Sequence, residues 1–553
     1  MKEKRGAERQ TETFFVLTVD EFCEFLNPRK MGNLSWKKLE LGFVLIYAAF
    51  FYASFIQRSL HLSHDYAGRL YGLRKGWLAG RFNDISDPQW RSFRENLPIL
   101  TIVMGSFVTI ANFLRYQYGM KGRGMSLLWT ILSLCYLVYL HGACVAFIFA
   151  IASANYFISK TFVESRYYLG ILWSFNVAFL VLNRVYEGYP FSLFGQRLAF
   201  LDNYRGTFRW HICFNFVVLR MISFGWDYYA AFNRHPFDLK RHMQRCEVCS
   251  SGKTCYHALQ EKGLHIEKYS FCMYMCYLIY APLYISGPIV SFNAFAAQLE
   301  MPQKSYSFLR ICFYGLRWFI AFLLMELITH FFYYNAFAKS GLWSQLSPFQ
   351  IFIVAYGVIN FMWLKFFLIW RYFRFWSLVS GVETPENMPR CISNCHDLET
   401  FWKSWHASYN KWLVRYMYIP LGGSKRKLLN IWVIFTFVAI WHDLEWKLVA
   451  WAWLTCIFLI PEIVVKSFAK AFKATSALGE FLNHELSAMS GAVTISCLMI
   501  ANLVGYVAGP TGIKLLISRM TEKEARLVLA TIFCSFYVGV KLMFHIHDMR
   551  QKV

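Results

Sequence analysis

Charged residues are scarce in this sequence. Of its 553 residues, 16% are Asp, Glu, Lys or Arg, whereas 57% are hydrophobic and 19% are aromatic. Charged residues make up about 25% of a typical soluble globular domain. The shortage of charge therefore excludes an ordinary soluble protein and indicates a membrane protein.

Short segments of alternating hydrophobicity, which are typical of transmembrane β-strands, are also missing. The apolar residues form continuous runs instead, such as 41–55, 125–157, 169–181 and 488–508. A helix of about 20 apolar residues spans the hydrocarbon core of a bilayer and satisfies its own backbone hydrogen bonds. The sequence thus predicts an all-α polytopic membrane protein with about 11 to 12 crossings. The run 126–158 is long enough for two short helices, and further crossings are expected near 210–229, 270–291 and 431–462, the last broken in its middle.

The sequence has no recognisable internal repeat and no low-complexity linker. This speaks against the duplicated halves typical of secondary transporters and predicts a single membrane-embedded domain over residues 1–553. Four regions stand out by composition: a polar N-terminal tail (1–38), an interfacial region rich in Arg, Gly and Trp (57–96), a basic Cys-rich loop (232–268) and the expected catalytic core (380–462).

Acidic residues are few relative to basic ones, 33 against 57, which gives a net charge of +24. Because the basic residues are dispersed between apolar runs, nucleic acid is not an expected partner. The anionic head groups of the lipid bilayer are the expected partner of most of them, and a share can help hold an anionic co-substrate such as an acyl-CoA. Residues 1–13 lack an apolar core, so no cleavable signal peptide is expected.

The 15 cysteines do not form a pattern typical of secreted disulfide-rich proteins, because many lie inside apolar runs. Most are expected to be packing residues. One group differs: Cys246, Cys249, Cys255 and His257 lie close together in the basic loop and are all common zinc ligands. Since the Cys-x-His spacing of the last two is atypical for zinc, free or disulfide-linked cysteines remain the alternative.

The segment between residues 401 and 424 holds the most polar and ionisable side chains in an apolar setting. Read as one helix, this segment carries a stripe of tryptophans and tyrosines on one face and Lys403, His406 and Asn410 on another. The predicted helix ends near Pro420, because proline cannot continue it. The sequence therefore predicts a polar helical line that contains a histidine.

A second histidine, His442, follows the charge-free run 431–441 and precedes the apolar sequence that resumes at Leu448. Ionisable groups between two short apolar runs are expected to lie inside the membrane, where they usually line a cavity or a functional path. A lone histidine in such a place is usually a hydrogen-bonded packing residue. Two of them beside tryptophans favour a functional pair.

Several motifs in this chain resemble the membrane-bound O-acyltransferase (MBOAT) family, in particular its glycerol-uptake-protein (GUP) branch, which is related to Hedgehog acyltransferase. The longest is Arg415-Tyr416-x-Tyr418-Ile419-Pro420-x-Gly422-Gly423-Ser424, followed by Trp441-His442-Asp443. Others are Gly76-Trp77-Leu78-x-Gly80-Arg81, Arg209-Trp210 with Phe214-Asn215-Phe216, Leu219-Arg220, Pro282-Leu283 with Gly287-Pro288-Ile289, and Thr384-Pro385-Glu386-Asn387-Met388-x-Arg390-Cys391.

The resemblance implies a bundle of transmembrane and re-entrant helices around a catalytic chamber. In that family a fatty acyl group passes from acyl-CoA, usually to a hydroxyl, and no further cofactor is required. The family's catalytic histidine corresponds to His442, and its second position, which is Asn, Asp or His in different branches, corresponds to His406. The expected substrate-binding residues are Lys403, Asn410, Arg415, Trp441 and Asp443.

For the GUP branch, the resemblance suggests a multi-pass protein of the endoplasmic reticulum membrane. Its expected acceptor is a lysophospholipid or the lyso-form of a glycosylphosphatidylinositol (GPI) anchor, reacylated at the sn-2 position. Two alternatives stay open: acylation of a secretory protein, and symport of glycerol with protons.

Overall fold

The computed structural model of the protein describes residues 36–552 except 79, 235–236, 472–476 and 508. The polar N-terminal tail predicted for residues 1–38 lies almost entirely outside the described residues. Within them, helices dominate, and the one sheet is an antiparallel hairpin of β1 (Leu73–Lys75) and β2 (Phe82–Asp84). The predicted all-α polytopic class is confirmed.

Nine helical stretches of the described chain are long and apolar enough to cross a bilayer. One of them, Gly122–Phe162, contains α5 (Gly122–His141) and α6 (Val145–Phe162), so the run 126–158 holds two helices as expected. The other eight correspond to α3 (Trp36–Tyr66), α4 (Pro88–Tyr118), α7 (Tyr168–Val185), α15 (Phe308–Phe331), α17 (Pro348–Val379), α21 (Trp446–Ala471), α22 (Ala477–Tyr506) and α24 (Ala525–Lys552).

Three runs that the sequence counts as crossings form helices outside this group. The run near 210–229 becomes α8 (Trp210–Phe232), which carries the buried charges Arg220 and Asp227. The run near 270–291 is divided into α12 (Phe271–Ile279) and α13 (Ala281–Tyr284), and α20 (Lys427–His442) has 16 residues. These elements are too short or too charged to cross a bilayer alone. Helices α8, α12 and α13 are largely buried in the protein, whereas α20 exposes Leu428, Leu429 and Val433.

Shorter elements connect the long helices. They are α9 (Leu239–Met243), α10 (Glu247–Ser250), α11 (Tyr256–Glu261), α14 (Phe292–Glu300), α16 (Tyr334–Lys339), α18 (Leu398–Ser404), α19 (Ala407–Leu413), the π-helical turn η10 (Val414–Tyr418), α23 (Gly509–Thr521), and 3-10 turns at Ala67–Arg69, Gly142–Cys144, Phe191–Phe194, Gln196–Tyr204, Ile266–Lys268, Leu342–Gln345, Ile392–Asn394 and Gly423–Arg426.

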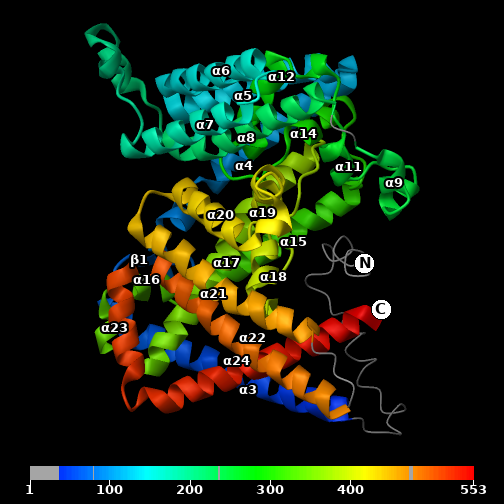
Figure 1. The fold of residues 1–553 in the computed structure, drawn as a ribbon. Coiled ribbons are helices and arrows are strands. Elements are labelled where there is room, and N and C mark those ends of the chain that lie inside the picture. The colour runs from blue at the N-terminus through cyan, green and yellow to red at the C-terminus, as the bar shows by residue number, and fades with distance from the viewer. Residues whose placement is uncertain (1–35, 79, 235–236, 472–476, 508, 553) are drawn as a thin grey trace.

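The helices form two groups, and the segment that carries His406 and His442 lies between them (Figure 1). In the first, α5 packs on α12, and α6 and α7 pack on α8. In the second, the first described helix, α3, packs on the last, α24, which also contacts α22. Between these groups lie α17, α18, α19 and α20. The two ends of the described chain therefore close one group of the bundle.

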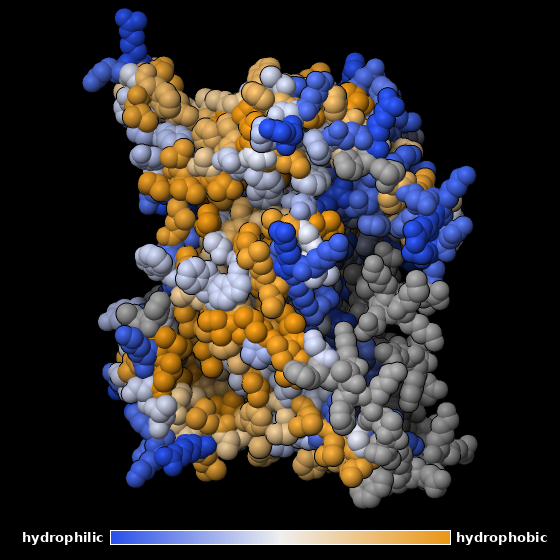
Figure 2. Space-filling view, in the orientation of Figure 1, coloured by the Kyte–Doolittle hydropathy of each residue, from blue (hydrophilic) through white to orange (hydrophobic). Residues whose placement is uncertain are grey.

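Large hydrophobic side chains are exposed on several long helices, for example Phe43 and Ile46 on α3, Ile102 on α4 and Leu309 on α15. Figure 2 shows a broad hydrophobic band across one face, with hydrophilic residues gathered at the edges and on the loop that carries α9. A soluble protein rarely exposes so much apolar surface. These side chains suit contact with lipid.

The region predicted to be interfacial, residues 57–96, combines the end of α3, the hairpin and the start of α4. The hairpin is fixed to the rest of the protein by Asp84, whose carboxylate accepts hydrogen bonds from the backbone N–H groups of Asn335 (2.9 Å) and Ala336 (3.0 Å) at the start of α16. Trp77, at the hairpin turn, donates a hydrogen bond to Glu326 of α15 (3.0 Å).

Candidate active site

The helix predicted across residues 401–419 breaks at His406. Helix α18 ends at Ser404 and α19 begins at Ala407, while His406 between them has φ 46° and ψ 50°. This left-handed conformation is uncommon for a residue other than glycine and costs of the order of 1 to 3 kcal/mol. The prediction that Lys403, His406 and Asn410 form one helical line is therefore wrong, because Lys403 belongs to a different helix.

The break is held by Asn387 in the loop before α18. Its backbone carbonyl accepts a hydrogen bond from the N–H of Ala407 (3.0 Å), and its side-chain oxygen accepts one from the N–H of Ser408 (3.0 Å). The Ser408 hydroxyl in turn accepts a hydrogen bond from the N–H of Ile289 (2.8 Å). Since other residues cap the start of α19, the imidazole of His406 is left available for another task.

The residue before Asn387 is a buried carboxylate. Glu386 lies 3.2 Å from the guanidinium of Arg371 and 3.5 Å from that of Arg374. Burial alone would raise the pKa of Glu386, but the two guanidinium groups and nearby backbone N–H groups outweigh it and lower the pKa below its usual value. Glu386 is therefore charged, and it ties the Asn387 loop to α17.

The side chain of His406 is buried against aromatic rings. Its imidazole stacks on Trp370 of α17 with ring centroids 4.3 Å apart and planes inclined by 14°. It also lies 5.2 Å from the ring of Tyr409 and 6.1 Å from that of Trp441. Within the described part of the chain, its Nε2 atom is buried and has no hydrogen-bond partner. An unsatisfied buried ring nitrogen is costly, which suggests that it serves a ligand.

His442 occupies the last position of α20 and, unlike His406, is exposed. Its ring centroid lies 4.8 Å from that of Trp441, 6.0 Å from that of Trp451 on α21 and 6.4 Å from that of Tyr506 on α22. An accessible imidazole bordered by three aromatic rings is suited to meet an amphipathic substrate.

Trp441 contacts both histidines and is fixed by Asn215 of α8. The Asn215 side-chain amide donates a hydrogen bond to the Trp441 carbonyl (2.7 Å), and the Trp441 indole N–H donates one to the Asn215 carbonyl (3.0 Å). This reciprocal pair locks the end of α20, and with it His442, to α8. Trp441 is thus fixed by Asn215, with its ring centroid 6.1 Å from that of His406 and 4.8 Å from that of His442.

Asp443 forms an ion pair with Arg184 on α7, in which both guanidinium nitrogens donate to the carboxylate. The same carboxylate accepts a hydrogen bond from the N–H of Leu444 (2.8 Å). Asp443 therefore joins the end of α20 to α7, beside the histidine that it follows in sequence.

The other predicted substrate-binding residues differ in how far their side chains are buried. Lys403 is exposed and pairs with Glu399 at 2.7 Å. Asn410 is half-buried one turn into α19. The guanidinium of Arg415 lies 3.3 Å from Asp227 and also pairs with Glu261, so protein carboxylates already balance its charge. The structure gathers His406, Trp441 and His442, and leaves Lys403 and Arg415 engaged elsewhere.

The predicted site residues do not include Asn387, Asn215, Trp370 or Arg184. The first two stand inside motifs that carried the resemblance, in Thr384–Cys391 and Phe214–Phe216, which was a signal that they have a function. Trp370 and Arg184 lie in ordinary apolar runs far from both histidines in sequence, and only tertiary contacts bring them to the site.

The metal ligands predicted in the basic loop need one correction. His242, Cys246, Cys249 and Cys255 place their ligand atoms within 4.8 Å of one another. His257 stands outside this group: its side chain is 57% exposed and its Nδ1 atom lies 3.9 Å from Glu261. His242 takes the place expected for His257, because a helical turn brings a residue four positions before Cys246 beside it.

Comparison with known families accounts for this arrangement. A family model described as MBOAT, membrane-bound O-acyltransferase family, matches residues 196–500, which include both histidines and Asn215 and Asn387.

The chain belongs to the membrane-bound O-acyltransferase family.

Its relatives extend the match to nearly the whole length. The chain is 35% identical to the membrane-bound O-acyltransferase GUP1 of Saccharomyces cerevisiae over 94% of this chain and 92% of the relative. It is 33% identical to gup1 of Schizosaccharomyces pombe over 86% and 82%. The mouse protein-cysteine N-palmitoyltransferase HHAT is 27% identical over 43% of this chain and 50% of its own. The resemblance read from the motifs is confirmed, and the protein is a multi-pass membrane acyltransferase.

Proposed function

We propose that this acyltransferase takes a fatty acyl group from acyl-CoA and transfers it to the sn-2 hydroxyl of lyso-GPI in the endoplasmic reticulum membrane. The observation that carries the proposal is that both imidazoles pack near the ring of Trp441. His442 is accessible, and His406 is buried with an unpartnered ring nitrogen.

In the proposed reaction His442 is the general base. A hydroxyl is a weak nucleophile near neutral pH, and a neutral imidazole can accept its proton during attack. The acceptor oxygen bonds to the thioester carbonyl carbon, the carbon–sulfur bond breaks, and the CoA thiolate leaves. The proton held by His442 then passes to that thiolate, so the base is regenerated.

His406 is proposed to stabilise the oxyanion that forms on the thioester carbonyl. A buried Nε2–H without a protein partner can donate a hydrogen bond to this oxygen in a site of low dielectric. The stack on Trp370 and the cap from Asn387 hold the ring and its backbone before substrate arrives. Such preorganisation favours the transition state over the bound substrate.

No acyl-enzyme step is included. Ser408, in the first turn of α19, is buried, and its hydroxyl accepts a hydrogen bond from the N–H of Ile289, which does not suit a nucleophile. A thioester is already activated, so direct transfer within a ternary complex is sufficient.

The choice of a hydroxyl as acceptor follows the extent of similarity. The relatives matched over 86% to 95% of this chain are named O-acyltransferases. The relative named as a protein-cysteine N-palmitoyltransferase matches 43% of it. Acylation of a secretory protein is therefore the second candidate, and glycerol symport is the third.

The test is an acceptor panel with the purified full-length protein in lipid nanodiscs. Labelled acyl-CoA is supplied with lyso-GPI, lysophosphatidylcholine, lysophosphatidylinositol or a peptide with an N-terminal cysteine. The proposal expects acyl transfer to lyso-GPI, with no transfer by His442→Ala protein of the same thermal stability.

Transfer of the label to the peptide alone would indicate that the acceptor is a protein and not a lipid. Transfer to lysophosphatidylcholine but not to lyso-GPI would support acyl transfer to a lipid and overturn the assignment of lyso-GPI as acceptor. Glycerol uptake in sealed vesicles without transfer to any acceptor would favour the symporter.

A further inference from the structure

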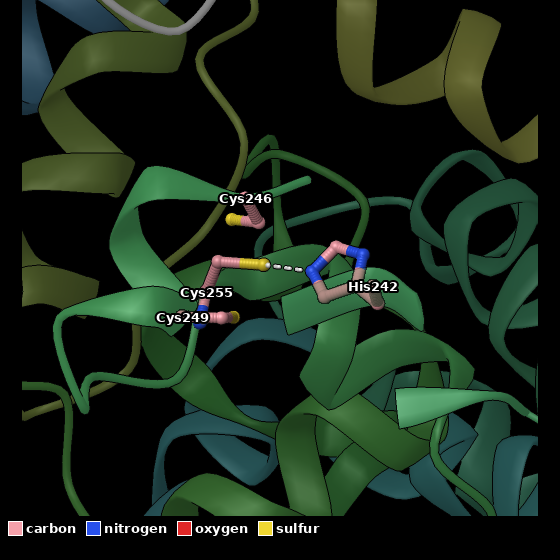
Figure 3. Close-up of side chains that lie close together, drawn as sticks. All are labelled: His242, Cys246, Cys249 and Cys255. Atoms are coloured by element: carbon pink, nitrogen blue, oxygen red, sulfur yellow. Dashed lines mark hydrogen bonds between the residues drawn. The ribbon is translucent and has the colours of Figure 1, made fainter. Parts of the chain in front are cut away.

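The loop between α8 and α12 brings three cysteines and one histidine together, away from the active site. Figure 3 shows the side chains of His242, Cys246, Cys249 and Cys255 turned toward a common centre. Their ligand atoms all lie within 4.8 Å of one another, and His242 Nε2 is 3.2 Å from Cys255 Sγ. His242 belongs to α9, Cys246 and Cys249 lie at the start of α10 and within it, and Cys255 directly precedes α11.

We propose that these four residues hold a structural zinc ion. Zinc prefers four nitrogen and sulfur ligands in a tetrahedron, with bonds of about 2.3 Å to sulfur and 2.0 to 2.1 Å to nitrogen. Such bonds place ligand atoms roughly 3.4 to 3.8 Å apart, a spacing the observed cluster reaches with shifts of about 1 Å or less. Binding displaces one proton from each cysteine thiol, and His242 coordinates in its neutral form.

Backbone donors around the cluster suit thiolate ligands. The N–H of Cys255 points at Cys249 Sγ and that of Ala258 at Cys255 Sγ, each at 3.4 Å. Hydrogen bonds of this kind orient metal ligands and stabilise their negative charge. Gly252, with φ +80°, lets the chain reverse between Cys249 and Cys255. The local backbone is therefore arranged as a metal-binding turn.

The charge of the surroundings fits the same ligand set. Three thiolates, one neutral imidazole and Zn²⁺ carry a net charge of −1. The loop supplies Lys240, Arg241, Arg245 and Lys253 close to the ligands in sequence, and cations nearby favour thiolates.

The apolar core of the loop is too small to order it strongly. Its buried members are Cys249, Cys255 and Ala258, packed by the partly buried Phe237, Leu239, Cys246 and Val248. Small units of this kind usually need a metal or disulfides to fold, and zinc binding supplies folding free energy directly.

Beyond the last ligand, α11 carries Gln260 and Glu261, and both contact Arg415 in η10, the turn that directly follows α19. The zinc ion is thus expected to hold α11 against the catalytic segment.

The test is the metal content of the full-length protein, expressed in zinc-supplemented medium and purified in detergent without chelators. Mass spectrometry of the elements should find about one zinc per chain, since one tetrahedral site is proposed. Replacement by Co²⁺ should give the intense visible absorption bands of a tetrahedral site together with sulfur-to-cobalt charge transfer.

Variants distinguish the ligand set. His242→Ala and Cys249→Ser should lose zinc, His242→Cys should keep it as a four-cysteine site, and His257→Ala and Cys312→Ser should keep it as matched controls. Zinc-free wild-type protein with alkylatable thiols, or with a disulfide in this loop, would overturn the proposal. Loss of zinc from His257→Ala but not from His242→Ala would overturn the assignment of His242.

Discussion

The cysteine cluster and the histidine site are built over different distances. His242, Cys246, Cys249 and Cys255 lie within one short loop, whereas the groups around His406 and His442 come from α8, α17, α19, α20, α21 and α22. A local cluster can form as soon as its turns form. The candidate active site requires several distant helices, because Trp370 and Tyr506 meet the histidines, and Asn215 meets Trp441, only through tertiary packing.

The two regions also treat histidine differently. His242 lies against a cysteine sulfur at 3.2 Å, as a ligand should. The Nε2 atom of His406 has no protein partner among the described residues, as a group waiting for substrate should. Five predictions test this contrast, from the largest expected effect on the acyl-transfer rate to the smallest.

His442→Ala is expected to have the largest effect. Loss of a general base lowers the rate by about 10² to 10⁴-fold, and measurement of initial rates with saturating acyl-CoA and acceptor will show it. His64→Ala is the matched control, because His64 is exposed at the end of α3. A His442→Ala enzyme that retained half of the wild-type rate would refute the base assignment.

His406→Ala is expected to lower kcat by about 10² to 10³-fold, the loss typical of one oxyanion donor, with little change in KM. Alanine also suits the positive φ of this position poorly. His406→Asn is the better companion, because asparagine tolerates the left-handed region and keeps a donor. The asparagine variant should recover part of the rate. Equal loss in both, with a raised KM, would instead indicate a role in binding.

Asn387→Ala should lower kcat by about tenfold, corresponding to about 1.4 kcal/mol. It removes the side-chain oxygen that accepts from the Ser408 N–H, so the left-handed turn at His406 is held less well. Asn387→Asp keeps the acceptor and should restore most of the rate. The positioning role is contradicted if kcat is unchanged while only thermal stability falls.

Asp443→Asn and Arg184→Ala should each reduce kcat/KM by about threefold. The double variant should reduce it by no more than either single variant, since the coupling energy of a partly exposed ion pair is about 1 kcal/mol. The reason is that both residues act through the same contact at the end of α20. A rise in the acceptor KM for Asp443→Asn, but not for Arg184→Ala, would support the predicted contact of Asp443 with substrate.

Cys249→Ser should change the rate least, by about twofold or less at a temperature where the protein is folded, yet lower its unfolding temperature. The loop meets the catalytic segment at Arg415, beyond the end of α19, and not at either histidine. Thermal unfolding followed by fluorescence, with Cys312→Ser as control, measures the shift. A rate as low as that of His406→Ala would show that the two regions are coupled rather than independent.

Much of the architecture could be predicted from composition and from runs of apolar residues. The bilayer thickness sets the length of a spanning helix, so α3, α15 and α22 can be recognised without any partner. The runs that became α8, α12 and α20 were harder, because their fate depends on whether the protein or the lipid surrounds them. His406 and His442 were recognisable for the same reason as the helices: polar groups in apolar sequence are costly and stand out.

The sequence by itself determined that this is a helical membrane protein. It also predicted that the chemistry centres on His406 and His442 and that candidate metal ligands gather in one basic loop. Tertiary structure decided the rest. It broke the expected helix at His406, because Asn387 from another segment caps α19 and stabilises a left-handed residue. It also fixed Trp441 beside both histidines through Asn215, and it placed His242 rather than His257 with the three cysteines. Helical periodicity is local, whereas these contacts join residues that are distant in sequence or depend on how one turn packs on the next.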